Sequence, residues 1–185
     1  MGIGSEVTTL RRAVFLDRDG VLNRAQVRQG RPHPPANMDE LKVLPGVPQA
    51  LWALREAGWL LIVVTNQPDV ARGITTREDV EAIHAALAGQ MPIDEFRTCF
   101  HDDAQRCTCR KPEPGLLLDA AREHSIDLAA SYMVGDRWRD VQAGERAGCT
   151  TLFIDYRYAE PRPERADFTV TGLPEAARII LGAHR

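Results

Sequence analysis

Several residues that can act as metal ligands, nucleophiles or proton donors follow directly after short apolar runs in this sequence. They are Asp17, Asp19, Thr65, Asn66 and Asp136. Where such runs are parallel strands, their carboxyl ends form the crevice in which open α/β sheets bind ligands. An acidic residue at one strand end is as often an ordinary helix N-cap, but polar residues at three strand ends together favour a ligand site.

The pair Asp17 and Asp19 indicates a metal site. In an extended backbone, residues two apart point to the same side, so both carboxylates are expected to face the crevice while Arg18 faces elsewhere. Two neighbouring carboxylates repel each other unless a cation or a shared proton relieves them. A magnesium ion would do so, and Asp136 offers a third oxygen ligand of the kind that Mg²⁺ prefers. Asp140, one helical turn further on, can add a ligand or hydrogen-bond to one.

These residue types are the parts that phosphoryl transfer needs: a nucleophile, a metal, groups that hold the phosphate, and a proton donor. Asp17 can be the nucleophile, and Asp19 the acid that later activates water. Thr65 and the backbone N–H groups after it can hold the phosphate, and Lys111 can neutralise it. Only two of the 23 basic residues are lysines, and Lys111 follows a cysteine cluster directly, which favours a functional role over a solvated surface position.

The cysteine cluster predicts a structural zinc site. Its four candidate ligands are Cys99, His101, Cys107 and Cys109. Three thiolates and one imidazole make a closed tetrahedral set without a vacancy, as in structural zinc sites. Zinc would tie the loop 99–109 and so fix Arg110 and Lys111 beside the phosphate. The alternative is a group of free thiols with an incidental histidine. The fourth cysteine, Cys149, is expected to be a buried core residue.

Alternating strands and helices are expected to position these residues. Continuous apolar runs predict strands over 13–16, 60–64, 97–100, 132–134 and 151–154. Amphipathic spacing predicts helices over 47–56, 76–87, 113–124, 139–147 and 174–181. Strands that are apolar on both faces are typical of parallel sheets, so the pattern predicts a doubly wound, Rossmann-like α/β fold with a mostly parallel sheet. The segments 28–37 and 156–165 are expected to be loops.

Composition limits the choice of function. The 185 residues are 44% hydrophobic and 26% charged, which predicts one globular domain over residues 1–185. The formal net charge of −3 argues against nucleic-acid partners and anionic lipid surfaces. The longest apolar run, 60–64, is far shorter than the roughly 20 residues of a membrane span. We therefore expect a cytoplasmic, monomeric protein that acts on a small phosphorylated metabolite.

Four segments of the sequence resemble, in order, the four motifs of the haloacid dehalogenase superfamily of phosphatases. They are residues 15–23, 64–67, 110–112 and 134–140, and the resemblance covers about 14–154. The chain is similar to the zinc-containing branch without a cap domain, which comprises heptose-bisphosphate and histidinol-phosphate phosphatases. The spacing independently supports the absence of a cap, because about 45 residues separate successive motifs and the predicted strands and helices use them up.

The resemblance implies a role for each matching position. Asp17 would be the nucleophile and Asp19 the acid/base. Magnesium would be bound by the Asp17 carboxylate, the backbone carbonyl of Asp19 and Asp136, with Asp140 behind them. Contacts to the phosphate or the rest of the substrate would come from Thr65, Asn66, Gln67, Arg110, Lys111 and Arg137.

The resulting prediction is a Mg²⁺-dependent phosphomonoester hydrolase of carbohydrate metabolism that works through an aspartyl-phosphate intermediate. Its expected substrate is D-glycero-D-manno-heptose 1,7-bisphosphate, dephosphorylated at position 7, with histidinol phosphate as the alternative. A catalytically idle phospholigand-binding protein is the alternative of another class, and the intact Asp17, Asp19, Lys111 and Asp136 disfavour it.

The sequence departs from the family pattern in two loops that are expected to touch the leaving group. The segment after Asn23 carries Arg28 and Arg31 in place of the usual residues, and Pro68-Asp69 replaces small residues. Arg28 and Arg31 could bind a second phosphate in a bidentate manner or face solvent, and the sequence leaves both open.

Overall fold

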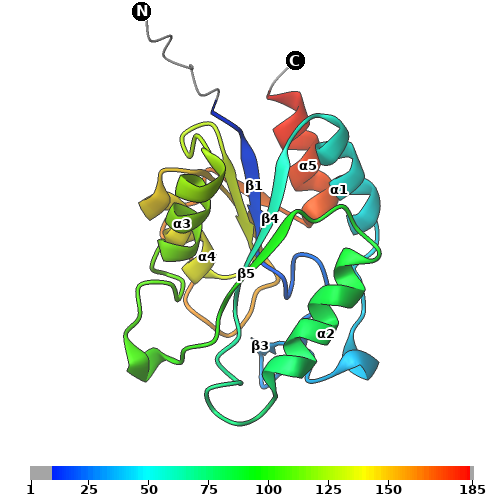
Figure 1. Cartoon of the computed structure of the whole chain (residues 1–185), viewed down its shortest axis with the longest axis vertical. Helices are drawn as coiled ribbons and strands as arrows, with labels where there is room; N and C mark the ends of the chain where they lie inside the picture. The colour runs from blue at the N-terminus through cyan, green and yellow to red at the C-terminus, as the bar shows by residue number, and fades with distance from the viewer. Residues whose placement is uncertain (1–9, 184–185) are drawn as a thin grey trace, which may run out of the picture.

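A six-stranded sheet forms the centre of the molecule. The computed structural model describes residues 10–183, and Figure 1 shows how their helices and strands are arranged. The strands are β1 (Ala13–Leu16), β4 (Leu60–Asn66), β5 (Glu95–Cys99), β6 (Tyr132–Gly135), β7 (Thr150–Ile154) and β8 (Phe168–Val170). They lie in the order β5-β4-β1-β6-β7-β8, and each neighbouring pair is parallel. The predicted parallel α/β sheet is confirmed.

Helices cover both faces of this sheet. They are α1 (Val47–Glu56), α2 (Arg77–Ala88), α3 (Gly115–His124), α4 (Trp138–Ala147) and α5 (Leu173–Gly182). In Figure 1, α3 and α4 lie on one side of the strands, while α1, α2 and α5 lie on the other. All five begin and end within two residues of the predicted positions, because strong apolar periodicity and clear end signals mark them.

Strand β1 shows why the sheet is central. All four of its residues are buried. Val14 and Leu16 pack into the apolar core beneath α1 and α5, whereas Ala13 and Phe15 pack into the core beneath α3 and α4. Successive side chains of a strand point to opposite faces, so a continuously apolar strand supplies both cores at once.

Two features of the fold were not anticipated from the sequence. A two-stranded antiparallel hairpin, β2 (Gln26–Arg28) and β3 (Arg31–His33), overlaps the start of the segment 28–37, which was expected to be a loop. Gln29 and Gly30 make its turn, and both have positive φ angles. The short strand β8 at the sheet edge also went unpredicted, because three residues of which two are exposed give no clear apolar pattern.

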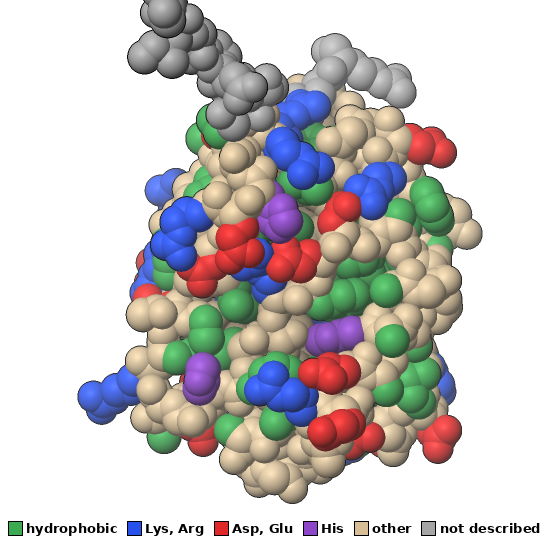
Figure 2. Space-filling model, in the orientation of Figure 1, with side chains coloured by type: hydrophobic (Ala, Val, Ile, Leu, Met, Phe, Trp, Pro, Cys, Tyr) green, Lys and Arg blue, Asp and Glu red, His purple; other side chains and the backbone are tan. Residues whose placement is uncertain are grey.

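On the face drawn in Figure 2, positive and negative side chains are interspersed rather than gathered by sign. Within residues 10–183, no helix has the length and apolar character needed to cross a bilayer.

Candidate active site

Strands β1 and β6 place two carboxylates side by side at the carboxyl edge of the sheet. Asp17 follows β1 and Asp136 follows β6, and the backbone N–H of Asp17 donates to the carbonyl of Val134 across 2.9 Å. This bond continues the parallel ladder by one residue beyond β1. Carboxylate oxygens of Asp17, Asp136 and Asp140 lie within 4.8 Å of one another, as the strand-end argument predicts.

A single lysine balances this acidic group. The Nζ atom of Lys111 lies 2.8 Å from Oδ1 of Asp17 and 2.6 Å from Oδ1 of Asp140. It also donates to the backbone carbonyl of Val64 at the end of β4, across 2.7 Å. The lysine side chain is only 2% exposed. Lys111 therefore joins the loop after β5 to the ends of β1 and β4.

The buried charges do not cancel. Burial disfavours the charged form of Lys111, but Asp140 and Asp17 outweigh that effect and raise its pKa. Burial, partly offset by Lys111, raises the pKa of Asp17 to about 6. The pKa of Asp136 is also raised, first by burial and then by repulsion from Asp17 and Asp140. Three carboxylates with one ammonium group leave an excess of negative charge that a divalent cation would relieve.

The atoms around Asp136 fit such a cation. Its Oδ1 atom is buried and has no hydrogen-bond partner. Carboxylate oxygens are the ligands that Mg²⁺ prefers. Gly20 makes room beside it: a Cβ atom at that position would lie 1.9 Å from Oδ2 of Asp136, and the positive φ of +88° also favours glycine. The group of Asp17, Asp136 and Asp140 could therefore hold Mg²⁺.

Asp19 is held by three neighbouring donors. Arg18 pairs with both of its oxygens, at 3.1 and 3.0 Å. Asn23 and Gln67 each donate to it across 2.9 Å. Gln67 also donates to the hydroxyl of Thr65 across 2.8 Å. Gln67 and Thr65, both expected to contact substrate, are 1% exposed and lie behind Asp19 rather than on the cavity wall.

The structure adds a residue that sequence reasoning missed. Arg18 was expected to face away from the site, yet it is fully buried and turns back to Asp19. Its remaining guanidinium nitrogen lies 3.2 Å from Nε2 of His84 in helix α2, and the imidazole ring stacks on Phe96 with centroids 4.3 Å apart. Burial, and then the charge of Arg18, lower the pKa of His84 to about 4, so the ring is neutral and Nε2 accepts the bond. No local sequence signal links positions 18 and 84.

A small cavity of about 40 Å³ opens over these residues. Three sets of residues line it: the acidic centre with Lys111 and Asn66, the arginines of motif four, and the end of the hairpin. They are Asp17, Asp19, Pro32, His33, Pro34, Asn66, Lys111, Arg137, Arg139 and Asp140. The end of the hairpin thus forms part of the cavity wall. A larger groove of about 730 Å³, near residues 162–169, contains none of the predicted site residues.

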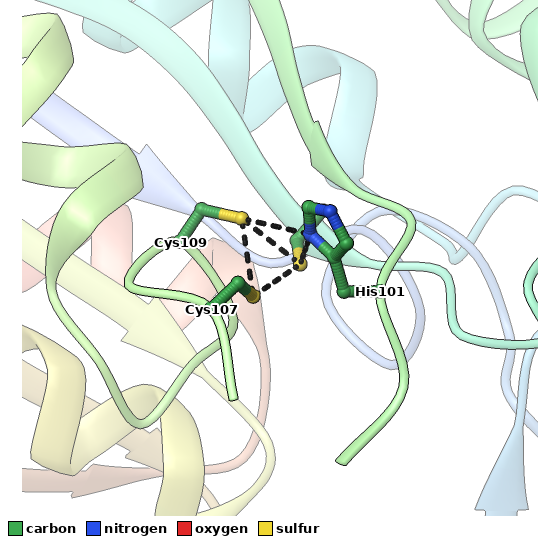
Figure 3. A group of neighbouring side chains, drawn as sticks. His101, Cys107 and Cys109 are labelled. Carbon is green, nitrogen blue, oxygen red and sulfur yellow. Dashed lines mark hydrogen bonds between the residues drawn. The ribbon is translucent and has the colours of Figure 1, made fainter. Parts of the chain in front are cut away.

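The four predicted zinc ligands converge at the end of β5. Figure 3 shows the thiols and the imidazole pointing toward a common centre. The sulfur atoms of Cys99, Cys107 and Cys109 are 3.2–3.6 Å apart, and Nδ1 of His101 lies 3.5 and 3.4 Å from two of them. Zn–S bonds of about 2.3 Å place tetrahedral sulfur ligands roughly 3.8 Å apart. The donor set and its geometry fit zinc.

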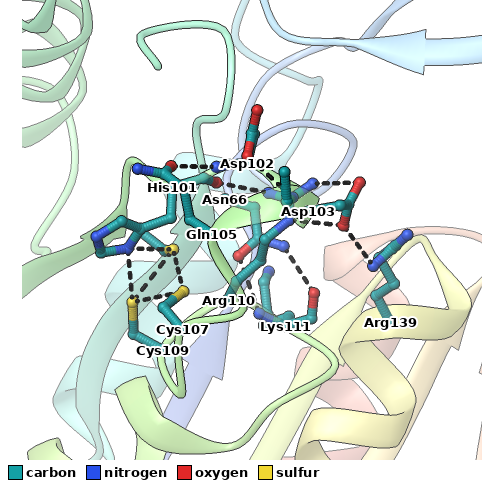
Figure 4. Close-up of polar contacts among 12 residues, drawn as sticks. Asn66, His101, Asp102, Asp103, Gln105, Cys107, Cys109, Arg110, Lys111 and Arg139 are labelled. Atoms are coloured by element: carbon teal, nitrogen blue, oxygen red, sulfur yellow. Dashed lines mark hydrogen bonds and ion pairs between the residues drawn. The ribbon is translucent and has the colours of Figure 1, made fainter. Parts of the chain in front are cut away.

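The cysteine-rich loop is fastened to Asn66, the last residue of β4 (Figure 4). Asn66 exchanges two hydrogen bonds with the backbone of Lys111, at 2.9 and 3.1 Å. Arg110, expected to contact substrate, lies off the cavity wall and pairs with Asp103 at 2.9 Å. Arg139 approaches the same carboxylate at 3.3 Å. Two arginines next to the site therefore share one exposed acidic partner.

The arginines of the hairpin lie elsewhere. Arg28 is 61% exposed and stands 3.9 Å from Glu40, and neither Arg28 nor Arg31 lines the cavity. Arg137 lines the cavity but is engaged in a bidentate ion pair with Glu160, at 2.8 and 2.5 Å. Cys149 is 6% exposed, as expected for a core residue.

Comparisons with known proteins agree on the kind of enzyme. A family model described as HAD-hydrolase-like matches residues 108–176. The D-glycero-beta-D-manno-heptose-1,7-bisphosphate 7-phosphatase of Photorhabdus laumondii is 41% identical over 186 residues, which span 92% of this chain and 95% of the relative. The enzyme of the same name from Escherichia coli K12 is 39% identical, over 91% of this chain and 93% of the relative.

Solved structures agree with these relatives. The D,D-heptose 1,7-bisphosphate phosphatase of B. bronchiseptica, complexed with magnesium and phosphate, matches with a TM-score of 0.79 and 33% identity. The match covers 93% of this chain and 99% of that one. A putative HAD-like phosphatase from Mesorhizobium loti matches with a TM-score of 0.76 and 27% identity, over 99% and 92% of the two chains.

The lowered pKa of His84 predicts a pH dependence of stability. Between pH 6.5 and about 4, the unfolded chain binds a proton at His84 that the native state does not bind. The contribution of this neutral ring to the free energy of unfolding is therefore complete above pH 6.5 and is lost as the pH falls toward 4. His84→Gln keeps an acceptor for Arg18 but does not titrate. When urea denaturation is compared at pH 7 and pH 5, the free energy of unfolding is expected to fall by about 2 kcal/mol more in wild type than in the variant. Equal losses would contradict the neutral, buried imidazole.

Proposed function

The chain belongs to the heptose-1,7-bisphosphate 7-phosphatase family of haloacid dehalogenase-like hydrolases, and from this premise we propose that it removes the 7-phosphate from D-glycero-D-manno-heptose 1,7-bisphosphate. The observation that carries the proposal is the buried centre of Asp17, Asp136, Asp140 and Lys111 at the strand ends. A binding protein would have no need of an acidic cluster that is this costly to bury.

Asp17 is the proposed nucleophile. One of its carboxylate oxygens attacks phosphorus, the bond between phosphorus and the sugar oxygen breaks, and the phosphoryl group is left on Asp17. Lys111, 2.8 Å from Oδ1, holds the carboxylate in place and neutralises charge on the phosphoryl oxygens. Water then attacks the aspartyl phosphate, which releases inorganic phosphate and restores Asp17.

Asp19 is the proposed acid and base. It gives a proton to the sugar oxygen as that oxygen leaves and takes one from the attacking water in the second step. Arg18, Asn23 and Gln67 hold its carboxylate at the rim of the cavity.

Magnesium is the proposed metal at this centre. The Asp17 carboxylate, the backbone carbonyl of Asp19 and the Asp136 carboxylate would hold it, with Asp140 behind them. When bound, it supplies charge neutralisation for the phosphate and lowers the repulsion between the phosphate and Asp17. Lys111 alone cannot do this, because Asp17 and Asp140 already share its charge.

A phosphate-release panel tests both substrate and nucleophile. We expect the fastest turnover on a heptose 1,7-bisphosphate, in a panel that contains both anomers and histidinol phosphate. Asp17→Asn is expected to lower turnover by roughly 10³-fold or more, since the amide cannot form the intermediate. Asp119→Asn, an exposed acidic residue of α3, is the matched control and should retain wild-type rates. Faster release from histidinol phosphate would overturn the substrate, and an active Asp17→Asn variant would overturn the nucleophile.

Zinc is proposed to be structural. Cys99, His101, Cys107 and Cys109 would bind it and so fix the path of the chain into Arg110 and Lys111. Cys107→Ser is expected to reduce zinc from about one per chain, measured by elemental analysis, and to lower the unfolding temperature by several degrees. As a control, Cys149→Ala removes a buried thiol that is not one of the four ligands, and this variant should retain about one zinc per chain. Full zinc content in Cys107→Ser would refute the assignment.

Arg139 is the proposed contact for the second phosphate of the substrate. It lines the cavity, and within residues 10–183 its ion-pair partner is the exposed Asp103, which a phosphate could replace. Arg139→Ala is expected to raise KM for the bisphosphate about 10-fold, as for loss of a charge-assisted hydrogen bond, and to leave KM for an aryl phosphate nearly unchanged. Arg28→Ala tests the hairpin arginines that the sequence suggested. A larger effect from Arg28→Ala would move the second phosphate to the hairpin.

A further inference from the structure

The carboxylate of Asp136 has two oxygens with different surroundings. Oδ1 is buried and has no hydrogen-bond partner. Oδ2 accepts a hydrogen bond from the hydroxyl of Tyr158 across 2.9 Å. On its other side Gly20 approaches so closely that a Cβ atom there would lie 1.9 Å from Oδ2. One oxygen is thus held from two sides, and the other is left available.

Tyr158 itself is held by its neighbours in the loop between β7 and β8. The backbone N–H of Ala159 donates to the carbonyl of Gly30 in the hairpin turn across 2.8 Å. Glu160 forms the bidentate ion pair with Arg137, the residue next to Asp136. Both contacts follow Tyr158 directly in sequence. The hydroxyl therefore reaches Asp136 from a backbone that is tied both to the hairpin and to the start of α4.

We infer that Tyr158 is a positioning residue for the metal site: its hydroxyl holds Oδ2 of Asp136, so that Oδ1, which has no hydrogen-bond partner, is left for the cation. The inference rests on the proposed function, which makes Asp136 a metal ligand. A ligand that is already oriented loses less freedom when the cation binds, and hydrogen bonds to ligating side chains commonly contribute 10- to 100-fold in metal affinity. No sequence motif marks Tyr158, which lies in a segment that was expected to be a loop.

Tyr156 provides a matched control. It lies two residues earlier in the same loop, its ring centroid is 5.6 Å from that of Tyr158, and its hydroxyl donates to the backbone carbonyl of Gly20 across 3.0 Å. Tyr156→Phe and Tyr158→Phe each delete one phenolic hydroxyl and keep the ring. Only the second deletion removes a bond to the Asp136 carboxylate.

The test is direct metal binding rather than turnover. Mn²⁺, a spectroscopic substitute for Mg²⁺, is titrated into the purified zinc-containing protein and followed by electron paramagnetic resonance. Tyr158→Phe is expected to raise Kd for Mn²⁺ about 10-fold. Tyr156→Phe should stay within about twofold of wild type, and Asp136→Asn should lose the site. Circular dichroism of each variant verifies the fold.

The possible failures are distinguishable. Wild-type Mn²⁺ affinity in Tyr158→Phe, together with loss of binding in Asp136→Asn, would overturn the role of Tyr158 and leave the proposed function intact. Equal weakening in both tyrosine variants would also overturn it, because the loop as a whole and not the bond to Asp136 would then be responsible. Unchanged binding in Asp136→Asn would overturn the metal assignment itself, and the inference with it.

Discussion

The structure of the site depends on an imbalance of buried charge. Three carboxylates, those of Asp17, Asp136 and Asp140, share a buried site with one ammonium group, that of Lys111. Burying like charges is costly, and the raised pKa values of Asp17 and Asp136 express that cost. The fold must therefore hold the carboxylates together against their repulsion. The same excess of negative charge makes the site a strong attractor for a divalent cation.

The sheet supplies the first part of that restraint. Asp17 and Asp136 leave neighbouring parallel strands, and a backbone hydrogen bond locks their starting points together. Gly135 lets Asp140 return close to the strand, since a Cβ at that position would lie 2.1 Å from Cβ of Asp140. Strand ends buried on both faces by helices cannot move apart without opening the core. The acidic group is a product of the sheet order.

Loops supply the second part of the restraint on the carboxylates. The predicted chain organisation leaves no room for an inserted cap domain, so loops must also shape the cavity. The cysteine-rich loop follows β5, and the two hydrogen bonds between Asn66 and the backbone of Lys111 hold its end in place. Lys111 thereby reaches the carboxylates that follow β1 and β6. The hairpin contributes Pro32 and His33 to the cavity wall, and the loop after β7 brings the Tyr158 hydroxyl to Asp136. Three loops from different parts of the chain thus meet at one strand edge. Each is fixed by hydrogen bonds, ion pairs or a proposed metal.

The sequence by itself determined the elements and the ligand types. Apolar runs and helix ends are local signals, so the core strands, the helices and the strand-end position of Asp17 and Asp136 could be predicted, as could the grouping of the four zinc-ligand candidates within eleven residues. Tertiary structure alone decided which distant groups meet. The pairing of Arg18 with His84 and the hydroxyl of Tyr158 on Asp136 join residues 66 and 22 positions apart. Such contacts depend on how helix α2 and the loop after β7 pack against the sheet. This packing produces no periodic pattern in the sequence from which the contacts could be predicted.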